Sequence, residues 1–316
     1  MTEILWTAAL LTTLLGATIT VVLRSRGVRW ELLRLFGVAL LARLPFAAVP
    51  VNWAEVIYPD DRYQTVAPAL WHLQAVLLRV LPAGWAPTDI IHALVRVAAA
   101  LTAPLFFLAF RPLVADVWPP TLLRTSALVL ALLPVLWFMG TTDCQHVIAQ
   151  LVWLFGLLMW TDAVRGQRLA IPGFLLAVGM LPAVRVETAV WTFAWFVLVP
   201  PQRHERIALR VAALGVVGTL SALALARVNG PQLRWKLLLN LPDLLLWPAE
   251  ALYSLTHTGL AYALLLGLAA LGGRTLFAAH RRLFVQTHLA FTLLATPCLL
   301  AKGSIYNGSC CATCCL

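Results

Sequence analysis

The chain has 316 residues, of which 61% are hydrophobic and 11% charged, and its formal net charge is +10. A soluble domain carries about 25% charged residues, so the composition excludes one large soluble core and predicts an all-α, polytopic membrane protein. The arginines fall in short clusters between apolar runs, which is typical of cytoplasmic loops and not of nucleic-acid binding. We therefore expect a single transmembrane domain over residues 1–316 and no nucleic-acid partner.

The first two apolar runs cover residues 4–23 and 32–50. Arginines follow the first run, whereas a signal peptide carries its positive residues before the apolar region. We therefore expect an uncleaved first span with an outside N-terminus and a second span that runs outward. Residues 51–91 then form a large outer loop.

This outer loop contains the sequence Tyr58-Pro59-Asp60-Asp61-Arg62-Tyr63-Gln64, with the only pair of adjacent acidic residues in the chain. A carboxylate pair beside a bilayer has to be hydrated, paired or bound to a ligand. Either carboxylate is able to act as a general base, and Asp61 is the candidate ligand of a divalent cation such as Mg²⁺ or Mn²⁺. The alternative is a solvated Pro-Asp turn with no chemical role.

Apolar residues recur at helical spacing within residues 65–91, which predicts an amphipathic helix on the membrane surface that ends before Pro82. We place His72 and His92 at the membrane interface, in or beside this helix. Residues 92–110, 121–139 and 147–161 then cross the membrane in alternation. Asp143 and His146, three residues apart at the outer end of a span, are a candidate metal or phosphate contact, with a helix cap as the alternative.

The interval between Arg168 and Arg203 is too short for two full spans of about 20 residues each. We expect a short re-entrant-like helix pair near 169–202, with its turn at 181–187 inside the protein. Arg185 and Glu187, the only charges in this interval, either form a structural ion pair or hold a lipid-linked phosphate, which a guanidinium binds well. Later spans at 207–226, 251–271 and 283–301 bring the expected total to about ten membrane helices.

The acidic segment resembles the first outer loop of the GT-C superfamily of integral membrane glycosyltransferases. It is most similar to the mannosyltransferases of the GPI-anchor and asparagine-linked glycan pathways. In these enzymes a Pro-Asp-Glu segment precedes an aromatic residue, Gln and a helix with a His, which corresponds here to Trp71-His72. The stretches Arg96–Pro104 and Arg185-Val186-Glu187-Thr188-Ala189 are similar to later segments of that family. Asp61 stands where Glu is commoner, and Val186 stands where Pro is commoner.

The resemblance implies an inverting transfer of a sugar, mannose by the family's default, from a polyprenyl- or dolichyl-phosphate donor. The acceptor would be a hydroxyl of a glycan, lipid or protein at the periplasmic or lumenal face. Asp60 and Asp61 are the catalytic candidates, with Asp60 as the base. The substrate-binding candidates are Tyr63, Gln64, His72, Asp143, His146, Arg185 and Glu187. A polytopic transporter or lipid-linked-sugar flippase, with Arg185 and Glu187 lining its pathway, is the alternative from another class.

The last residues, Ser309-Cys310-Cys311-Ala312-Thr313-Cys314-Cys315-Leu316, suit no membrane segment. Palmitoylation or metal binding is one interpretation of the cysteines. A different interpretation comes from the reading frame. One possible set of codons for residues 310–316, read one nucleotide out of frame, encodes an Arg-Tyr-Leu-Leu-Pro stretch, which is an ordinary start to another helix. We hypothesise that a frameshift near Cys310 truncates a longer enzyme, and the DNA sequence tests this.

Overall fold

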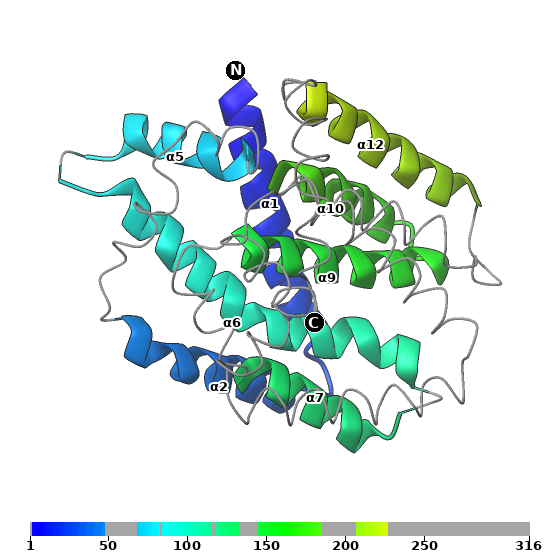
Figure 1. The fold of residues 1–316 in the computed structure, drawn as a ribbon. Coiled ribbons are helices and arrows are strands. Elements are labelled where there is room, and N and C mark those ends of the chain that lie inside the picture. The colour runs from blue at the N-terminus through cyan, green and yellow to red at the C-terminus, as the bar shows by residue number, and fades with distance from the viewer. Residues whose placement is uncertain are drawn as a thin grey trace, which may run out of the picture. The chain divides into compact units, whose positions relative to one another are not determined.

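The computed structural model describes residues 2–47, 68–82, 84–115, 118–132, 145–184 and 207–226 (Figure 1). Every regular element in these ranges is a helix, which confirms the all-α class. Apart from the last two residues of α12, these helices belong to one compact unit. The helices are α1 (Thr2–Leu23), α2 (Arg29–Ala47), α5 (Pro68–Val80), α6 (Pro87–Val114), α7 (Pro120–Leu132), α9 (Gln145–Val164), α10 (Ala170–Val184) and α12 (Ile207–Ala226).

Three helices in the described part of the chain are long and apolar enough to cross a membrane, namely Glu3–Leu23, Asp89–Pro112 and Val147–Val164. The helices α7 and α10 are also apolar but shorter. These lengths match the need for about 20 apolar residues per span, so the chain is an integral membrane protein. Several of the expected spans, including 251–271 and 283–301, lie outside the described residues.

Small residues bring α1, α9 and α10 close together. A Cβ atom added at Gly16 of α1 would lie 3.4 Å from Phe155 Cζ of α9. One added at Gly156 of α9 would lie 3.3 Å from the Cβ of Ala177, which belongs to α10. Glycine at such positions lets helix backbones approach, which is how membrane helices gain van der Waals contact.

The C-terminus of α9 is closed by a Schellman motif. The amide of Gln167 donates to the Asp162 carbonyl at 3.0 Å, and the amide of Gly166 donates to the Ala163 carbonyl at 3.0 Å. Gly166 has a φ of 89°, a left-handed conformation that a side chain would strain. The motif thereby brings the side chain of Gln167 back beside Asp162.

Arg24, the residue after α1, joins this cap to α1. Its guanidinium forms an ion pair with the Asp162 carboxylate, and its Nη2 donates to Gln167 Oε1 at 2.9 Å. Arg165 Nη2 approaches the Pro112 carbonyl of α6 at 3.5 Å. The C-terminal ends of α1, α6 and α9 therefore lie together.

The starts of α2 and α7 are also joined, because Arg124 of α7 forms an ion pair with Glu31 of α2. Both helices follow closely in sequence after the ends of α1 and α6. We call this part of the unit the basic end. Its arginines are Arg24, Arg26, Arg29, Arg34, Arg111, Arg124, Arg165 and Arg168.

The predicted amphipathic helix is confirmed as α5, which ends at Val80, and α6 begins at Pro87 as the breakers predict. Two expected boundaries were wrong. The helix α6 continues past Arg111 to Val114, and α10 continues to Val184, through the first four residues of the turn expected at 181–187. A proline removes only one backbone hydrogen-bond donor from a helix. Pro182 is buried, so backbone groups of an unwound helix would find no water to bind there, and the helix continues.

Candidate functional site

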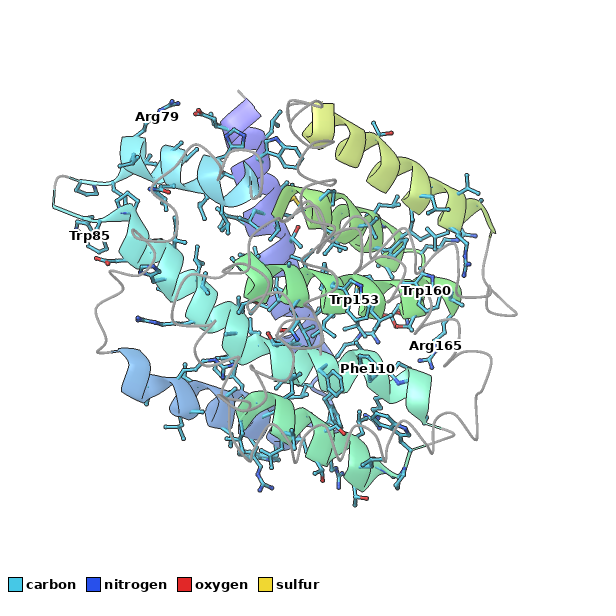
Figure 2. All side chains as sticks on the ribbon, in the orientation of Figure 1. Arg79, Trp85, Phe110, Trp153, Trp160 and Arg165 are labelled. Atoms are coloured by element: carbon cyan, nitrogen blue, oxygen red, sulfur yellow. The ribbon has the colours of Figure 1, made fainter. Side chains whose placement is uncertain are left out.

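The opposite end of the unit is built around α5. Arg79 near the end of α5 contacts Glu3 at the start of α1, with Nη1 and Oε2 separated by 2.7 Å. Both side chains reach solvent, so the pair adds little stability. The pair shows that the C-terminal end of α5 lies beside the N-terminus of α1. The helix α5 therefore packs along α1 away from the basic end. Figure 2 labels Arg79 on α5 and Arg165 near the far end of α6.

The C-terminal part of α10 reaches this α5 end. Its last residues, including Leu181, Ala183 and Val184, are buried, and α10 packs against α5. Arg185 is the next residue after Val184 in the chain, and the acidic segment ends four residues before Pro68, where α5 begins. The predicted site residues Asp60, Asp61, Tyr63, Gln64, Asp143, Arg185 and Glu187 lie outside the described residues.

Two predicted site histidines fall on described helices. His72 is buried on α5, beside the buried Leu70 and Leu73. It lies on the surface helix where we expected it, and its place at the membrane interface stays a prediction. His146 lies in the first turn of α9, and its side chain is outside the described part of the structure.

His92 was expected at the membrane interface, and that placement stays a prediction. It lies in α6, is 7% exposed, and its Nε2 has no hydrogen-bond partner among the described residues. Asp89 and Arg96 lie three residues before and four residues after it, on the same side of the helix. The Nε of Arg96 is also buried and has no partner in the described part of the chain.

Arg43 is the buried cation that the sequence reasoning missed. It is 3% exposed on α2, and its Nη1 donates to the carbonyl of Ala39 at 2.5 Å and to that of Ala131 on α7 at 3.4 Å. Its Nε has no hydrogen-bond partner within the described ranges, and none of the described carboxylates forms an ion pair with it. The available signal was an arginine inside an otherwise apolar run, which marks a functional candidate in a membrane protein.

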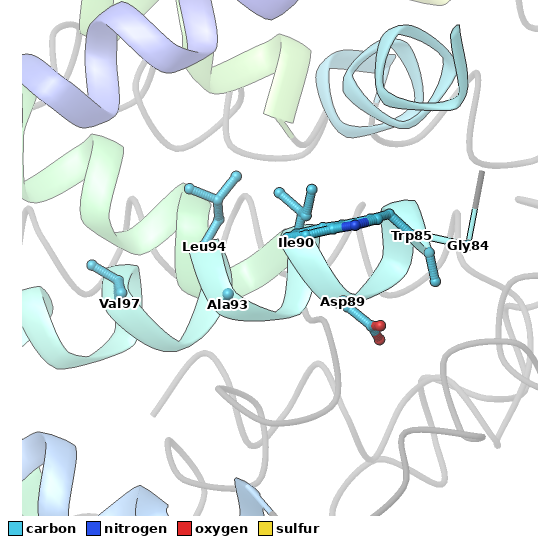
Figure 3. Close-up of a pocket in the computed structure, with 8 residues that line it drawn as sticks. Gly84, Trp85, Asp89, Ile90, Ala93, Leu94 and Val97 are labelled. Atoms are coloured by element: carbon cyan, nitrogen blue, oxygen red, sulfur yellow. The ribbon is translucent and has the colours of Figure 1, made fainter. Parts of the chain in front are cut away.

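A hollow of about 500 Å³ opens beside the first turns of α6. Figure 3 shows the ring of Trp85 beside Ile90 and the Asp89 carboxylate pointing away from Ile90 and Leu94. Its wall is apolar apart from Asp89, so it suits a hydrocarbon or the face of a ring better than a charged group. The remaining lining residues are Gly84, Ala86, Ala93 and Val97.

Two arginines are the described groups best suited to bind an anion. Arg43 and Arg96 come from α2 and α6, which pack against each other, and both carry buried N–H groups without a partner among the residues described. A guanidinium binds phosphate oxygens in forked pairs. Within the described ranges no group of three His, Cys, Asp or Glu side chains is placed to hold a metal ion, and the candidate ligand Asp61 is outside them.

The chain was compared with known protein families, proteins and structures. No protein-family model, curated protein or solved structure matches the chain.

Proposed function

We propose that the protein is a membrane glycosyltransferase of GT-C type, which transfers a sugar from a lipid-phosphate donor to an acceptor hydroxyl. The observation that carries the proposal is the packing of α10 against α5. The acidic segment precedes α5 and the Arg185–Glu187 segment follows α10. The two segments that resemble the family's motifs therefore leave from helices that touch.

Each part of the reaction has a candidate residue. Asp60 accepts the proton of the acceptor hydroxyl while that oxygen attacks the anomeric carbon of the sugar. The bond from that carbon to the lipid phosphate breaks, and Arg185 neutralises the phosphate that leaves. Asp61 would hold a divalent cation, Mg²⁺ or Mn²⁺, which would supply positive charge to the leaving group.

Buried Arg43 supports a lipid-phosphate substrate. A cation held inside a membrane protein with only backbone carbonyls as described partners is costly unless an anion joins it. The apolar hollow beside α6 suits the first isoprene units of the donor, whose phosphate would lie deeper. Both features fit a substrate with a charged head and a hydrocarbon chain.

The test is transfer from a panel of polyprenyl-phosphate sugars by membranes that contain the protein. The variant Asp60→Asn should lose turnover yet still bind the lipid donor, because an amide cannot take the proton. The control is Glu31→Gln, which removes a carboxylate at the basic end, where it pairs with Arg124, and should leave turnover unchanged. Normal turnover by Asp60→Asn would remove the base assignment.

A transporter or lipid-linked-sugar flippase is the second candidate, and the same buried Arg43 favours it, since intramembrane charges also line transport pathways. The two functions separate by variant. In a transporter, Arg185→Gln should abolish movement of the lipid-linked sugar across vesicles while Asp60→Asn leaves it intact. In the enzyme, Asp60→Asn should be the more damaging of the two.

A further inference from the structure

The basic end carries far more positive charge than its own carboxylates balance. Two of its eight arginines, Arg24 and Arg124, form ion pairs with Asp162 and Glu31. The other six are exposed and have no acidic partner in the part of the chain that the structure describes. They are Arg26, Arg29, Arg34, Arg111, Arg165 and Arg168. The ion pairs and the Arg165–Pro112 contact hold the segments that carry these six together.

Two large apolar side chains stand exposed within this charged surface. Trp30 is 82% exposed between Arg29 and Arg34, and Leu169 is 95% exposed beside Arg168. Each lies at the end of an apolar helix or hairpin, α2 or α9–α10. Tryptophan at such a place favours the headgroup layer of a bilayer, where its ring is in contact with lipid and its N–H with water.

The α5 end does not share this composition. Its described charges near the helix ends are Arg79, which is paired with Glu3, and Asp89. Among the described residues, the exposed arginines without an acidic partner are therefore all at the basic end. A surface with this charge attracts an anionic layer and discriminates it from a zwitterionic one.

We propose that the basic end binds the headgroups of anionic phospholipids, with the unpaired arginines on the lipid phosphates and with Trp30 and Leu169 among the lipids at headgroup level. Guanidinium groups take phosphate oxygens in forked pairs, and each arginine near such a surface adds about fivefold to the affinity. This inference does not depend on the proposed enzymatic activity. It requires only the membrane helices and the charges at their ends.

The experiment uses the full chain in detergent micelles, titrated with phosphatidylglycerol or phosphatidylcholine brominated in the acyl chains, which quench the tryptophans that they touch. The wild-type protein should prefer phosphatidylglycerol, and about 1 M salt, which shortens the Debye length to about 3 Å, should remove the preference. The triple variant Arg26→Gln/Arg29→Gln/Arg168→Gln should lower the preference by at least about tenfold. These side chains are exposed, so the fold should survive their replacement.

The matched control is Arg79→Gln at the α5 end, which should keep the wild-type preference. Trp30→Phe should remove part of the quenched fluorescence, whereas Trp85→Phe should not change the difference between the two lipids. The inference is overturned if the wild-type protein binds both lipids equally, if the triple variant keeps its preference, or if Arg79→Gln loses as much. Reversal of lipid binding by soluble glycerol phosphate would assign the arginines to a free anion and also overturn it.

Discussion

Arg24 and Asp162 form an ion pair between the end of α1 and the end of α9, and the two partners differ in their access to water. The Asp162 residue is 1% exposed, whereas the side chain of Arg24 is 33% exposed. Removal of the arginine leaves a buried carboxylate without its cation. Removal of the aspartate leaves a guanidinium that is able to turn into solvent.

We expect Arg24→Ala to cost more stability than Asp162→Ala. An uncompensated buried charge costs about 3 to 5 kcal/mol, and a released exposed arginine costs much less. The thermal unfolding midpoint of the purified protein measures the difference, with Arg26→Ala as a control because Arg26 is exposed and unpaired among the described residues. Equal losses for the two variants would mean that the partners are equally buried, contrary to the structure.

Gly166→Ala should destabilise the protein by about 1 to 2 kcal/mol, because alanine disfavours the left-handed backbone that the α9 cap requires. Gly166→Asn should cost less, since asparagine tolerates this conformation best among residues with side chains. Thermal unfolding of the two variants gives the order. A loss for asparagine as large as that for alanine would argue against the Schellman geometry.

The contact between α9 and α10 predicts that alanine is tolerated at one of two glycines and not at the other. At Gly156 an added Cβ meets the Cβ of Ala177 at 3.3 Å, and only movement of the helix backbone relieves this contact. At Gly173 it meets Met159 Sδ at 3.1 Å, and a methionine side chain moves aside easily.

We therefore expect Gly156→Ala to lower the unfolding midpoint by the equivalent of about 1 kcal/mol or more, and Gly173→Ala to change it little. The control is Gly37→Ala on α2, where an added Cβ has nothing within 4 Å. Recovery of recombinant protein in a monodisperse peak is a second readout. A stable Gly156→Ala variant would show that the helices are farther apart than described.

Arg43→Met should lower the transfer activity without lowering the stability of the protein. Replacement of a buried cation by an apolar side chain of similar length is often neutral or stabilising, so the unfolding midpoint should stay at or above that of the wild type. Transfer from the lipid donor should fall by about tenfold or more, since a charged hydrogen bond to phosphate contributes about 1.5 to 3 kcal/mol. Retained transfer would reduce Arg43 to a packing role.

The control for this variant is Arg124→Met at the basic end. It loses the ion pair with Glu31 and should become slightly less stable, while transfer is unchanged. A fall in transfer for both variants would point to a general loss of folded protein. The donor concentration that gives half-maximal rate should rise only for Arg43→Met.

Long apolar periodicity predicted the helices well, because a bilayer demands continuous apolar runs. The end of α1 at Leu23 and the bounds Ile207–Ala226 of α12 agree with the expected spans 4–23 and 207–226. Prolines in the polar loop predicted helix boundaries correctly, because α5 ends before Pro82 and α6 begins at Pro87. Pro112 and Pro182 lie inside helices instead, since packing against neighbouring helices stabilises a helix that contains a proline.

The candidate site was less predictable than the fold. Adjacent carboxylates and a short interval between arginines are visible in a sequence, so Asp60, Asp61 and Arg185 could be singled out. Burial of Arg43 and His92 depends on which helices pack against α2 and α6. A single sequence does not show which helices pack together. The burial of His72 on α5 depends in the same way on the helices that cover α5.

The helices α6 and α9 pack against each other yet carry membrane segments of unequal length. The apolar segment has 24 residues in α6 and 18 in α9, which correspond to about 36 Å and about 27 Å at about 1.5 Å per residue. A hydrocarbon core of about 30 Å is too thin for the first and slightly too thick for the second. We expect α6 to tilt to relieve this hydrophobic mismatch, so the acyl-chain length of the host bilayer should change the tilt of α6 and the distance of Trp85 from the bilayer centre.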